Sequence, residues 1–223
     1  MIAVVVGAGP GMGLALAQRF GAEGFTLALI ARRPEALATY ASELRTQSIT
    51  GAGFAADIAD EQSLRDAFAA IRAQLGDPDV LLFNASSNPA GRPYEISAGE
   101  VLDAYKIGAL GALISAQEVL GAMRLRGTGS LLFTGGGLAL KPWPPSTALA
   151  MSKAALRNLV ASLATDLSGT DIRVGSVLIN GLVGKPGFEP QAIAEQFWQV
   201  HAAPAGEFGH ELIYPQAVAN STR

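Results

Sequence analysis

A glycine-rich stretch near the start of the chain, Gly7 to Gly13, is the feature that most constrains the fold. It follows a short apolar run, Ile2 to Val6, and precedes a helical pattern, Leu14 to Phe20. A strand, a glycine-rich turn and a helix in this order form a phosphate-binding corner, because glycines let the backbone approach a pyrophosphate and the helix N-terminus offers free N–H groups. The stretch therefore predicts a dinucleotide site, with a structural turn as the alternative.

The glycines of this stretch allow two spacings. Gly7, Gly9 and Gly13 give G-x-G-x-x-x-G, a near miss of the general dinucleotide fingerprint. Gly7, Gly11 and Gly13 give G-x-x-x-G-x-G. Together with Met12, these glycines are the expected phosphate-binding part of the site.

Composition indicates a sheet that is covered on both faces. Hydrophobic residues make up 49% of the 223 residues and charged residues only 16%, so we expect strands that are buried on both faces of the sheet. The net charge of −3, without a long basic run, argues against a nucleic-acid partner. There is no cysteine, which excludes disulfides and thiolate metal sites, and we expect no metal. The N-terminal apolar run is too short for a signal peptide, and no run approaches the roughly 20 residues of a membrane span, so we expect a cytoplasmic protein.

Apolar strand patterns alternate with helical patterns along the chain. The expected strands are 2–6, 25–30, 51–57, 80–83, 130–134, 172–179 and 211–214. The expected helices are 14–20, 34–47, 61–75, 99–126, 146–167 and 190–200. This order predicts an α/β fold, a three-layer doubly wound parallel sheet with ligands at the carboxyl ends of its strands. We expect one domain over residues 1–215 and a C-terminal tail at 216–223.

The end of the second strand bears on the choice of cofactor. An NAD site usually has an acidic residue there, which accepts a hydrogen bond from the ribose 2′-hydroxyl, whereas an arginine suits the 2′-phosphate of NADP. This chain has Ala31 at that point, followed by Arg32 and Arg33. We therefore expect NADP in preference to NAD. The alternative is two solvated charges at the start of a helix.

Polar side chains that follow the third and fourth strands are further candidates for the cofactor site. Asp57, which precedes Ile58, can accept a hydrogen bond from an adenine amino group, whereas Asp60 is expected to cap the next helix. Asn84, which precedes Ala85, can hold neighbouring strands apart and shape the floor of the cofactor site. A simple Asx-turn is the alternative for Asn84.

In this order and at these intervals, the motifs resemble those of the short-chain dehydrogenase/reductase family over nearly the whole chain. The resemblance rests on Gly7, Gly11 and Gly13, on Asp57-Ile58, on Asn84-Ala85, and on Lys153 followed by Ala154-Ala155-Leu156. It implies an NAD(P)-dependent oxidoreductase acting on a carbonyl or alcohol, with a seven-stranded Rossmann fold. It also implies a homodimer or homotetramer packed through two long helices. It names no substrate.

The resemblance further implies a catalytic set of Asn, Ser, Tyr and Lys, of which this chain keeps the lysine. In the family, the tyrosine transfers the substrate proton, and a lysine one helical turn later lowers the pKa of that tyrosine and binds the ribose. Lys153 is present, but Leu149 stands at the tyrosine position, Gly136 at the serine position and Gly108 at the asparagine position. The departures therefore lie on the substrate side of the site.

Other side chains near the expected site have structural explanations. Ser146 lies on nearly the same helix face as Leu149, although we expect it to be the N-cap of its helix. The run Gly135 to Gly137 either turns N–H groups toward an oxyanion or forms a flexible exit from a strand. We expect both His201 and His210 at the surface.

Three functional hypotheses follow. The first is an NADP-dependent oxidoreductase of altered chemistry on a small carbonyl or alcohol, which Lys153 favours. The second is a non-catalytic NADP-binding sensor or partner subunit, which the loss of three catalytic side chains favours. The third is a structural dimer that has lost the cofactor, and the intact glycines argue against it.

Overall fold

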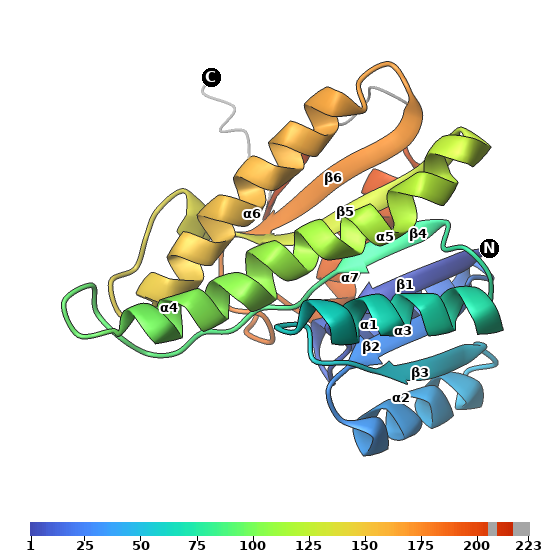
Figure 1. The fold of residues 1–223 in the computed structure, drawn as a ribbon, viewed down its shortest axis with the longest axis horizontal. Coiled ribbons are helices and arrows are strands. Elements are labelled where there is room, and N and C mark those ends of the chain that lie inside the picture. Colours follow the sequence, from blue (N-terminus) through green and yellow to red (C-terminus); the bar gives the residue numbers. More distant parts are fainter. Residues whose placement is uncertain (205–208, 216–223) are drawn as a thin grey trace.

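A sheet of seven parallel strands lies at the centre of the computed structural model, which describes residues 1–204 and 209–215 (Figure 1). The strands are β1 (Ile2–Val6), β2 (Thr26–Ala31), β3 (Gly51–Ala55), β4 (Val80–Phe83), β5 (Thr128–Gly136), β6 (Asp171–Ile179) and β7 (Glu211–Tyr214). Their order in the sheet is β3-β2-β1-β4-β5-β6-β7. This confirms the expected doubly wound Rossmann sheet. The expected tail, 216–223, lies outside the described residues.

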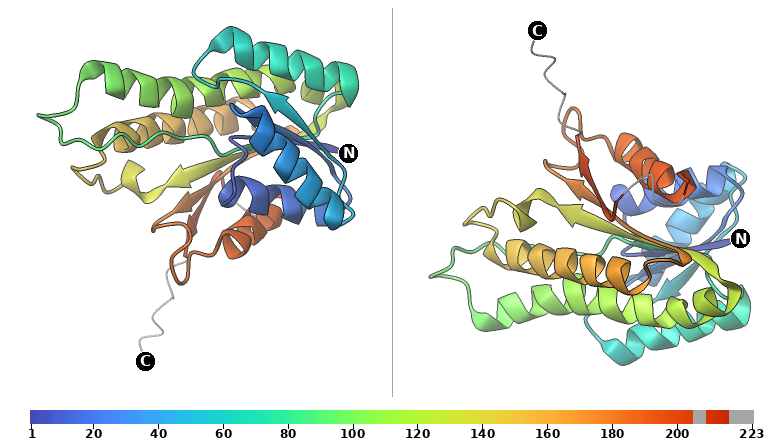
Figure 2. Two further views of the ribbon diagram at one scale, coloured as in Figure 1. Left: turned by 90° about the horizontal axis from the view of Figure 1, so that it is seen from below. Right: turned by 90° about the horizontal axis from the view of Figure 1, so that it is seen from above.

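Helices cover both faces of the sheet, as two further views show (Figure 2). One face carries α1 (Met12–Ala22), α2 (Pro34–Thr46) and α7 (Pro190–Ala202). The other carries α3 (Glu61–Gln74), α4 (Ala98–Tyr105), α5 (Gly111–Arg126) and α6 (Thr147–Asp166). None of the helices within residues 1–204 and 209–215 combines the length and the apolar character needed to cross a membrane.

Each face of the sheet has its own hydrophobic core, because successive side chains of a strand point to opposite faces. In β1, Ala3 and Val5 belong to the core beneath α1, α2 and α7, whereas Val4 and Val6 belong to the core beneath α3, α5 and α6. All four side chains are fully buried. Burial of a valine contributes about 1.5–3 kcal/mol, so a strand that is apolar along its whole length is stabilised from both sides.

The long helical region expected over residues 99–126 is confirmed, but it is not α-helical throughout. Between α4 and α5, residues Lys106–Leu110 form a π-helical turn. At this turn the chain runs against α6, where a Cβ atom on Gly108 would overlap the hydroxyl of Ser152. The π-helical turn thus contains a glycine that packs tightly against α6. Such turns are frequent at functional sites.

The third strand ends two residues earlier than expected. β3 ends at Ala55, and Asp57 lies in the turn that follows, where its carboxylate accepts a hydrogen bond of 3.0 Å from the N–H of Ala59. The expected N-cap of α3 is confirmed, since Asp60 accepts a hydrogen bond of 2.8 Å from the N–H of Ser63. The other expected elements agree with the structure to within two residues at either end.

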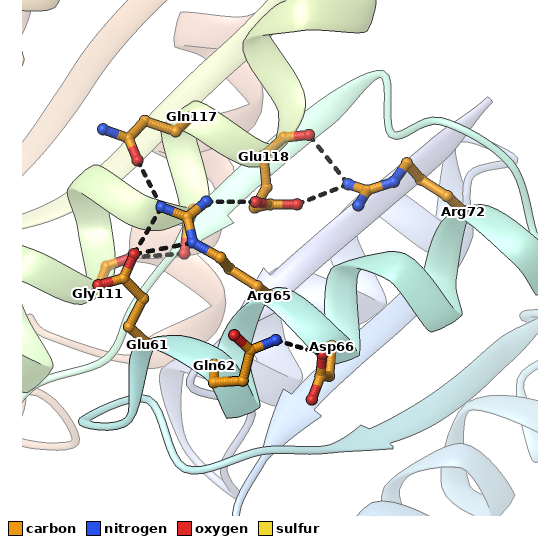
Figure 3. Close-up of polar contacts among 9 residues, drawn as sticks. Glu61, Gln62, Arg65, Asp66, Arg72, Gly111, Gln117 and Glu118 are labelled. Atoms are coloured by element: carbon orange, nitrogen blue, oxygen red, sulfur yellow. Dashed lines mark hydrogen bonds and ion pairs between the residues drawn. The ribbon is translucent and has the colours of Figure 1, made fainter.

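Ion pairs hold α3 against α5 (Figure 3). Glu118 of α5 lies between two arginines of α3, with its carboxylate oxygens 2.6 Å from Arg65 and 2.8 Å from Arg72. Arg65 also pairs with Glu61 at 2.8 Å. The Glu118 side chain is only 11% exposed, so its charge needs both partners. These contacts fix the helix that follows the Asp57 turn.

His201 is partly buried, whereas a surface role was expected for it. Its ring packs among the aromatic rings of Phe20, Phe25 and Trp198, at centroid distances of 5.4, 5.6 and 5.2 Å. Its Nδ1 lies 2.9 Å from the hydroxyl of Ser130. His201 is the last-turn residue of α7 that fills the gap between α1 and the start of β5, whereas His210 is exposed as expected.

Candidate functional site

Two adjoining cavities lie along the carboxyl ends of the strands. The first has a volume of about 400 Å³ and extends from the end of β2 to the loop after β4. The second has a volume of about 800 Å³ and lies between the end of β5, the start of α6 and the segment after β6. Asn84 and Ser86 line both cavities, so the two adjoin at these residues and are together called the cleft.

The cleft brings together most of the residues that the sequence predicts for a cofactor site. The predicted residues in the first cavity are Gly7, Arg32, Asp57, Ile58, Asn84 and Ala85. Those in the second are Met12, Asn84, Gly136, Leu149 and Lys153. The remaining predicted residues, Gly9, Gly11, Gly13, Arg33 and Gly108, line neither cavity. The structure thus separates Arg32, which lines the cleft, from Arg33, which does not.

Close backbone contacts explain two of the glycines in the turn between β1 and α1. Gly7 has a φ of +88°, and a Cβ on it would lie 2.7 Å from the backbone of Ala85. A Cβ on Gly13 would lie 2.7 Å from the carbonyl oxygen of Gly7 and 2.8 Å from Cα of Ala8. These two glycines allow α1 to approach the turn and the turn to approach β4.

The other two glycines of the turn border open space. A Cβ on Gly9 or Gly11 would meet no atom within 4 Å. Gly11 precedes α1, and every residue of this helix is described. The N-terminus of α1 has no side-chain cap and no acidic residue in its first turn. An uncapped helix start with open space before it suits an anion, because its N–H groups carry partial positive charge.

Asn84 links the strands at the floor of the cleft. Its Nδ2 donates to the carbonyl oxygen of Gly7 at 3.1 Å, and its Oδ1 accepts from the hydroxyl of Thr134 at 3.0 Å. The side chain therefore connects the turn after β1 with the end of β5. These two hydrogen bonds are compatible with the expected role of Asn84 between neighbouring strands, and its part in a cofactor site stays a prediction.

Lys153 lies at the wall of the second cavity and is only 7% exposed. Its Nζ donates to the carbonyl oxygen of Thr134 at 2.6 Å. Burial lowers the pKa of Lys153 to about 8, because the low-dielectric surroundings disfavour its charge. The ammonium group is thus held at the end of β5, on the same strand end that Asn84 contacts.

The three positions that hold the tyrosine, serine and asparagine of the resembled family carry no side chain that can donate a proton. Leu149, one helical turn before Lys153, lines the second cavity with an apolar side chain. Gly136 faces the lysine and leaves space where a side chain would stand. Gly108 is buried, and the hydroxyl of Ser152 occupies the space that a Cβ atom at this position would need. That hydroxyl donates to the carbonyl oxygen of Ala104 at 3.2 Å.

Two expectations about neighbouring residues are corrected. Ser146 occupies the N-cap position of α6 but forms no side-chain capping bond, and it lines the second cavity instead. The run Gly135 to Gly137 is not a flexible exit, because β5 continues through Gly136. A Cβ on Gly135 would lie 3.1 Å from Cα of Leu178, and one on Gly137 would overlap the amide oxygen of Asn180. Close packing against the end of β6 therefore requires these glycines.

Sequence reasoning missed several residues of the second cavity, among them Thr134, Lys141, Trp143 and Asn180. Thr134 had a usable signal, because it is the last side chain of β5 before the glycine run. Lys141 and Trp143 lie in a proline-rich loop that carries no periodic pattern, so the sequence alone does not place them beside Leu149.

Comparisons with known proteins agree with this geometry. The sequence profile described as short chain dehydrogenase matches residues 1–184. The chain is 32% identical over 173 residues to the oxidoreductase asL5 of Sarocladium schorii, covering 77% of this chain and 68% of that protein. It is 31% identical over 180 residues to the 2-(R)-hydroxypropyl-CoM dehydrogenase of Xanthobacter autotrophicus, covering 79% and 72%.

Solved structures share the whole architecture. A short-chain dehydrogenase from Rhodopseudomonas palustris has a TM-score of 0.87 at 25% identity, covering 97% of this chain and 98% of that one. A variant of the actinorhodin polyketide ketoreductase, solved with NADPH, has a TM-score of 0.89 at 24% identity, covering 96% and 95%. The profile match over most of the chain, together with the relatives above 30% identity, decides the family. The chain is a member of the short-chain dehydrogenase/reductase family.

Proposed function

We propose that the protein binds NADP(H) and transfers hydride between the nicotinamide and a carbonyl or alcohol substrate, without a tyrosine as proton donor. The observation that carries this proposal is the cleft of two adjoining cavities, with Arg32 in the first and Lys153 in the second. Its first cavity suits an adenosine moiety and its second leaves about 800 Å³ for the rest of the cofactor and a substrate. The neighbouring ketoreductase structure solved with NADPH has the same fold.

The residues of the cleft fit such a cofactor. The uncapped start of α1 and the open space at Gly9 and Gly11 suit the pyrophosphate. Arg32 suits a 2′-phosphate, and Lys153 suits the hydroxyls of a ribose. When bound, the nicotinamide supplies or accepts the hydride. The protein's own residues bind and orient it, and the position of the family's tyrosine is held by Leu149, which has no proton to donate.

The preference for NADP over NAD is part of this proposal and rests on Arg32. The Arg32→Ala variant should bind NADPH roughly 10- to 100-fold more weakly while its affinity for NADH changes little, since a hydrogen bond to a charged group contributes about 1.5–3 kcal/mol. Arg33→Ala is the matched control, because this arginine lies outside the cleft. Calorimetric titrations of both variants with both cofactors test the preference. Equal losses for NADPH and NADH at Arg32 would contradict it.

Turnover should be slow. A positioned general acid typically contributes about 10²–10⁴ in rate, and neither Leu149 nor Gly136 can supply one. In this proposal the carbonyl oxygen takes its proton from water in the cavity, which suits only a reactive carbonyl. Oxidation of NADPH in the presence of a panel of aldehydes and ketones measures this activity. The Lys153→Met variant should lose it, and Lys106→Met, which changes a partly exposed lysine outside both cavities, should keep it.

A second candidate is an NADP-binding sensor or partner subunit without catalysis. The combined presence of Leu149, Gly136 and Gly108 favours it. The two candidates differ in one measurement. Protein that binds NADPH in calorimetry but oxidises it no faster than buffer with every carbonyl of the panel is a binder, and a rate that disappears in Lys153→Met identifies an enzyme.

A further inference from the structure

The second cavity carries positive charge and no negative charge. Of the residues that line it, all within the described part of the chain, Lys141 and Lys153 are the only ones with ionisable side chains. The whole chain has a net charge of −3, so this cavity departs from the average of the protein. A cleft lined by charge of one sign concentrates ligands of the opposite sign, because its low-dielectric walls focus the field.

We propose that the substrate of this cavity is an organic acid with an apolar body, whose carboxylate lies near Lys141 and whose carbonyl or hydroxyl carbon lies on the Lys153 side. This inference rests on the proposed oxidoreductase function and names the substrate class of the same site. It assigns to Lys141 the role of a specificity-determining residue.

The two lysines differ in their availability for a substrate carboxylate. The Nζ of Lys153 is buried and donates to the carbonyl oxygen of Thr134. Lys141 is exposed at the rim of the cavity, and its ammonium group forms no ion pair or hydrogen bond with any residue of 1–204 or 209–215. Its backbone is fixed, because its N–H donates to the carbonyl oxygen of Gly137 at 2.9 Å. Lys141 thus offers a free charge on an anchored backbone.

The surroundings of Lys141 suit an apolar body rather than a sugar or a small polar acid. Trp143, two residues along the same loop, is 60% exposed, and Leu182, in the segment after β6, is 71% exposed. Both line the cavity together with Leu138 and Leu149. Large apolar side chains that are exposed around a cavity mark a surface that a ligand covers.

The described wall of the second cavity contains no carboxylate, and this favours an acid over its neutral ester. An Asp or Glu there would repel an anionic substrate, and none lines this described cavity. A neutral ester of the same acid keeps the apolar contacts but loses the attraction to Lys141. An exposed ion pair contributes about 0.2–1 kcal/mol, which corresponds to a roughly 1.5- to 5-fold preference for the acid over its ester.

Binding measurements test the inference without requiring turnover. The full chain is saturated with NADP⁺ and titrated in a calorimeter with aryl and alkyl 2-oxo and 3-oxo acids, each beside its methyl ester. We expect the acid of at least one pair to bind roughly 1.5- to 5-fold more tightly than its ester at low salt. Lys141→Gln should remove this preference, Lys141→Arg should keep it, and Lys106→Gln, which removes the same charge outside the cavity, should leave it unchanged.

Three results would overturn the inference. The first is equal binding of acid and ester, or no binding of any acid in the panel. The second is an equal effect of Lys141→Gln on both ligands. The third is a loss of NADP⁺ affinity in Lys141→Gln, which would assign this lysine to the cofactor instead.

Activity measurements separate this inference from the proposed function. Acids that bind but are never reduced by NADPH would support the substrate class and contradict the proposed catalysis. Acids and esters that NADPH reduces with equal efficiency would support the proposed catalysis and contradict the substrate class.

Discussion

A Cβ atom on Gly136 would lie 3.4 Å from Cγ of Lys153, an ordinary contact at the wall of an open cavity. The glycine therefore leaves a space beside the lysine that a small side chain can fill without displacing it. Leu149 lines the same cavity one helical turn before Lys153. The variant that combines Gly136→Ser with Leu149→Tyr should fold and should raise the rate of carbonyl reduction by up to about 10²–10⁴, because it supplies a positioned proton donor.

The combination Gly136→Ser with Leu149→Phe is the control for this gain. It adds the same ring without a hydroxyl, so it should bind NADPH like the unmodified protein and show no gain in rate. Steady-state oxidation of NADPH with a reactive aldehyde compares the two. An equal gain in both variants would mean that filling the cavity, rather than proton donation, limits the reaction.

Gly108 should not tolerate a side chain, in contrast to Gly136. A Cβ there would overlap the hydroxyl of Ser152, and overpacking of this kind typically costs about 1–3 kcal/mol. Gly108→Ala should therefore lower the free energy of unfolding in urea, and Ser152→Ala should recover part of the loss, because it removes the overlapping atom. Additive effects of the two substitutions would show that the π-helical turn moves away instead.

Two glycines of the first turn should respond differently to alanine. At Gly13 the new Cβ would meet backbone atoms of Gly7 and Ala8, so Gly13→Ala should destabilise the fold itself. At Gly9 it would meet nothing within 4 Å, so Gly9→Ala should unfold like the unmodified protein but bind NADPH more weakly. Urea unfolding and calorimetry separate the two effects. Unchanged affinity in Gly9→Ala would place the phosphates elsewhere.

The order of the elements could be predicted from the sequence because both faces of each strand are buried. Runs such as Ile2–Val6 and Val80–Phe83 are apolar throughout, and a change from these runs to helical periodicity marks each crossover. The π-helical turn could not be predicted. It includes Gly108, which packs against Ser152 of α6, and this contact joins residues far apart in the chain.

The glycine turn and the polar strand ends of the site could also be predicted, because each follows a recognisable strand. The second cavity could not. Its rim is built by Lys141, Trp143 and Leu182 from two irregular segments, whose positions depend on tertiary packing rather than on local pattern. Ser146 shows the same limit, since its residue type favours an N-cap and yet its side chain lines the cavity.

His201 should make the protein less stable in mild acid. Burial, and next the charge of Arg173, lower the pKa of His201 below its usual value near 6.5. As the pH falls through about 6.5, the unfolded chain takes up a proton that the folded chain resists, so the free energy of unfolding decreases until the pH reaches the lowered pKa of the folded state. The His201→Gln variant removes this titration.

Between pH 7 and pH 5, the free energy of unfolding of His201→Gln should therefore decrease less than that of the unmodified protein. His210→Gln is the matched control, because His210 is the only other histidine and is exposed. Urea unfolding at both pH values gives the two differences, and equal acid sensitivity in the unmodified protein and His201→Gln would show that His201 takes up its proton without leaving the aromatic cluster.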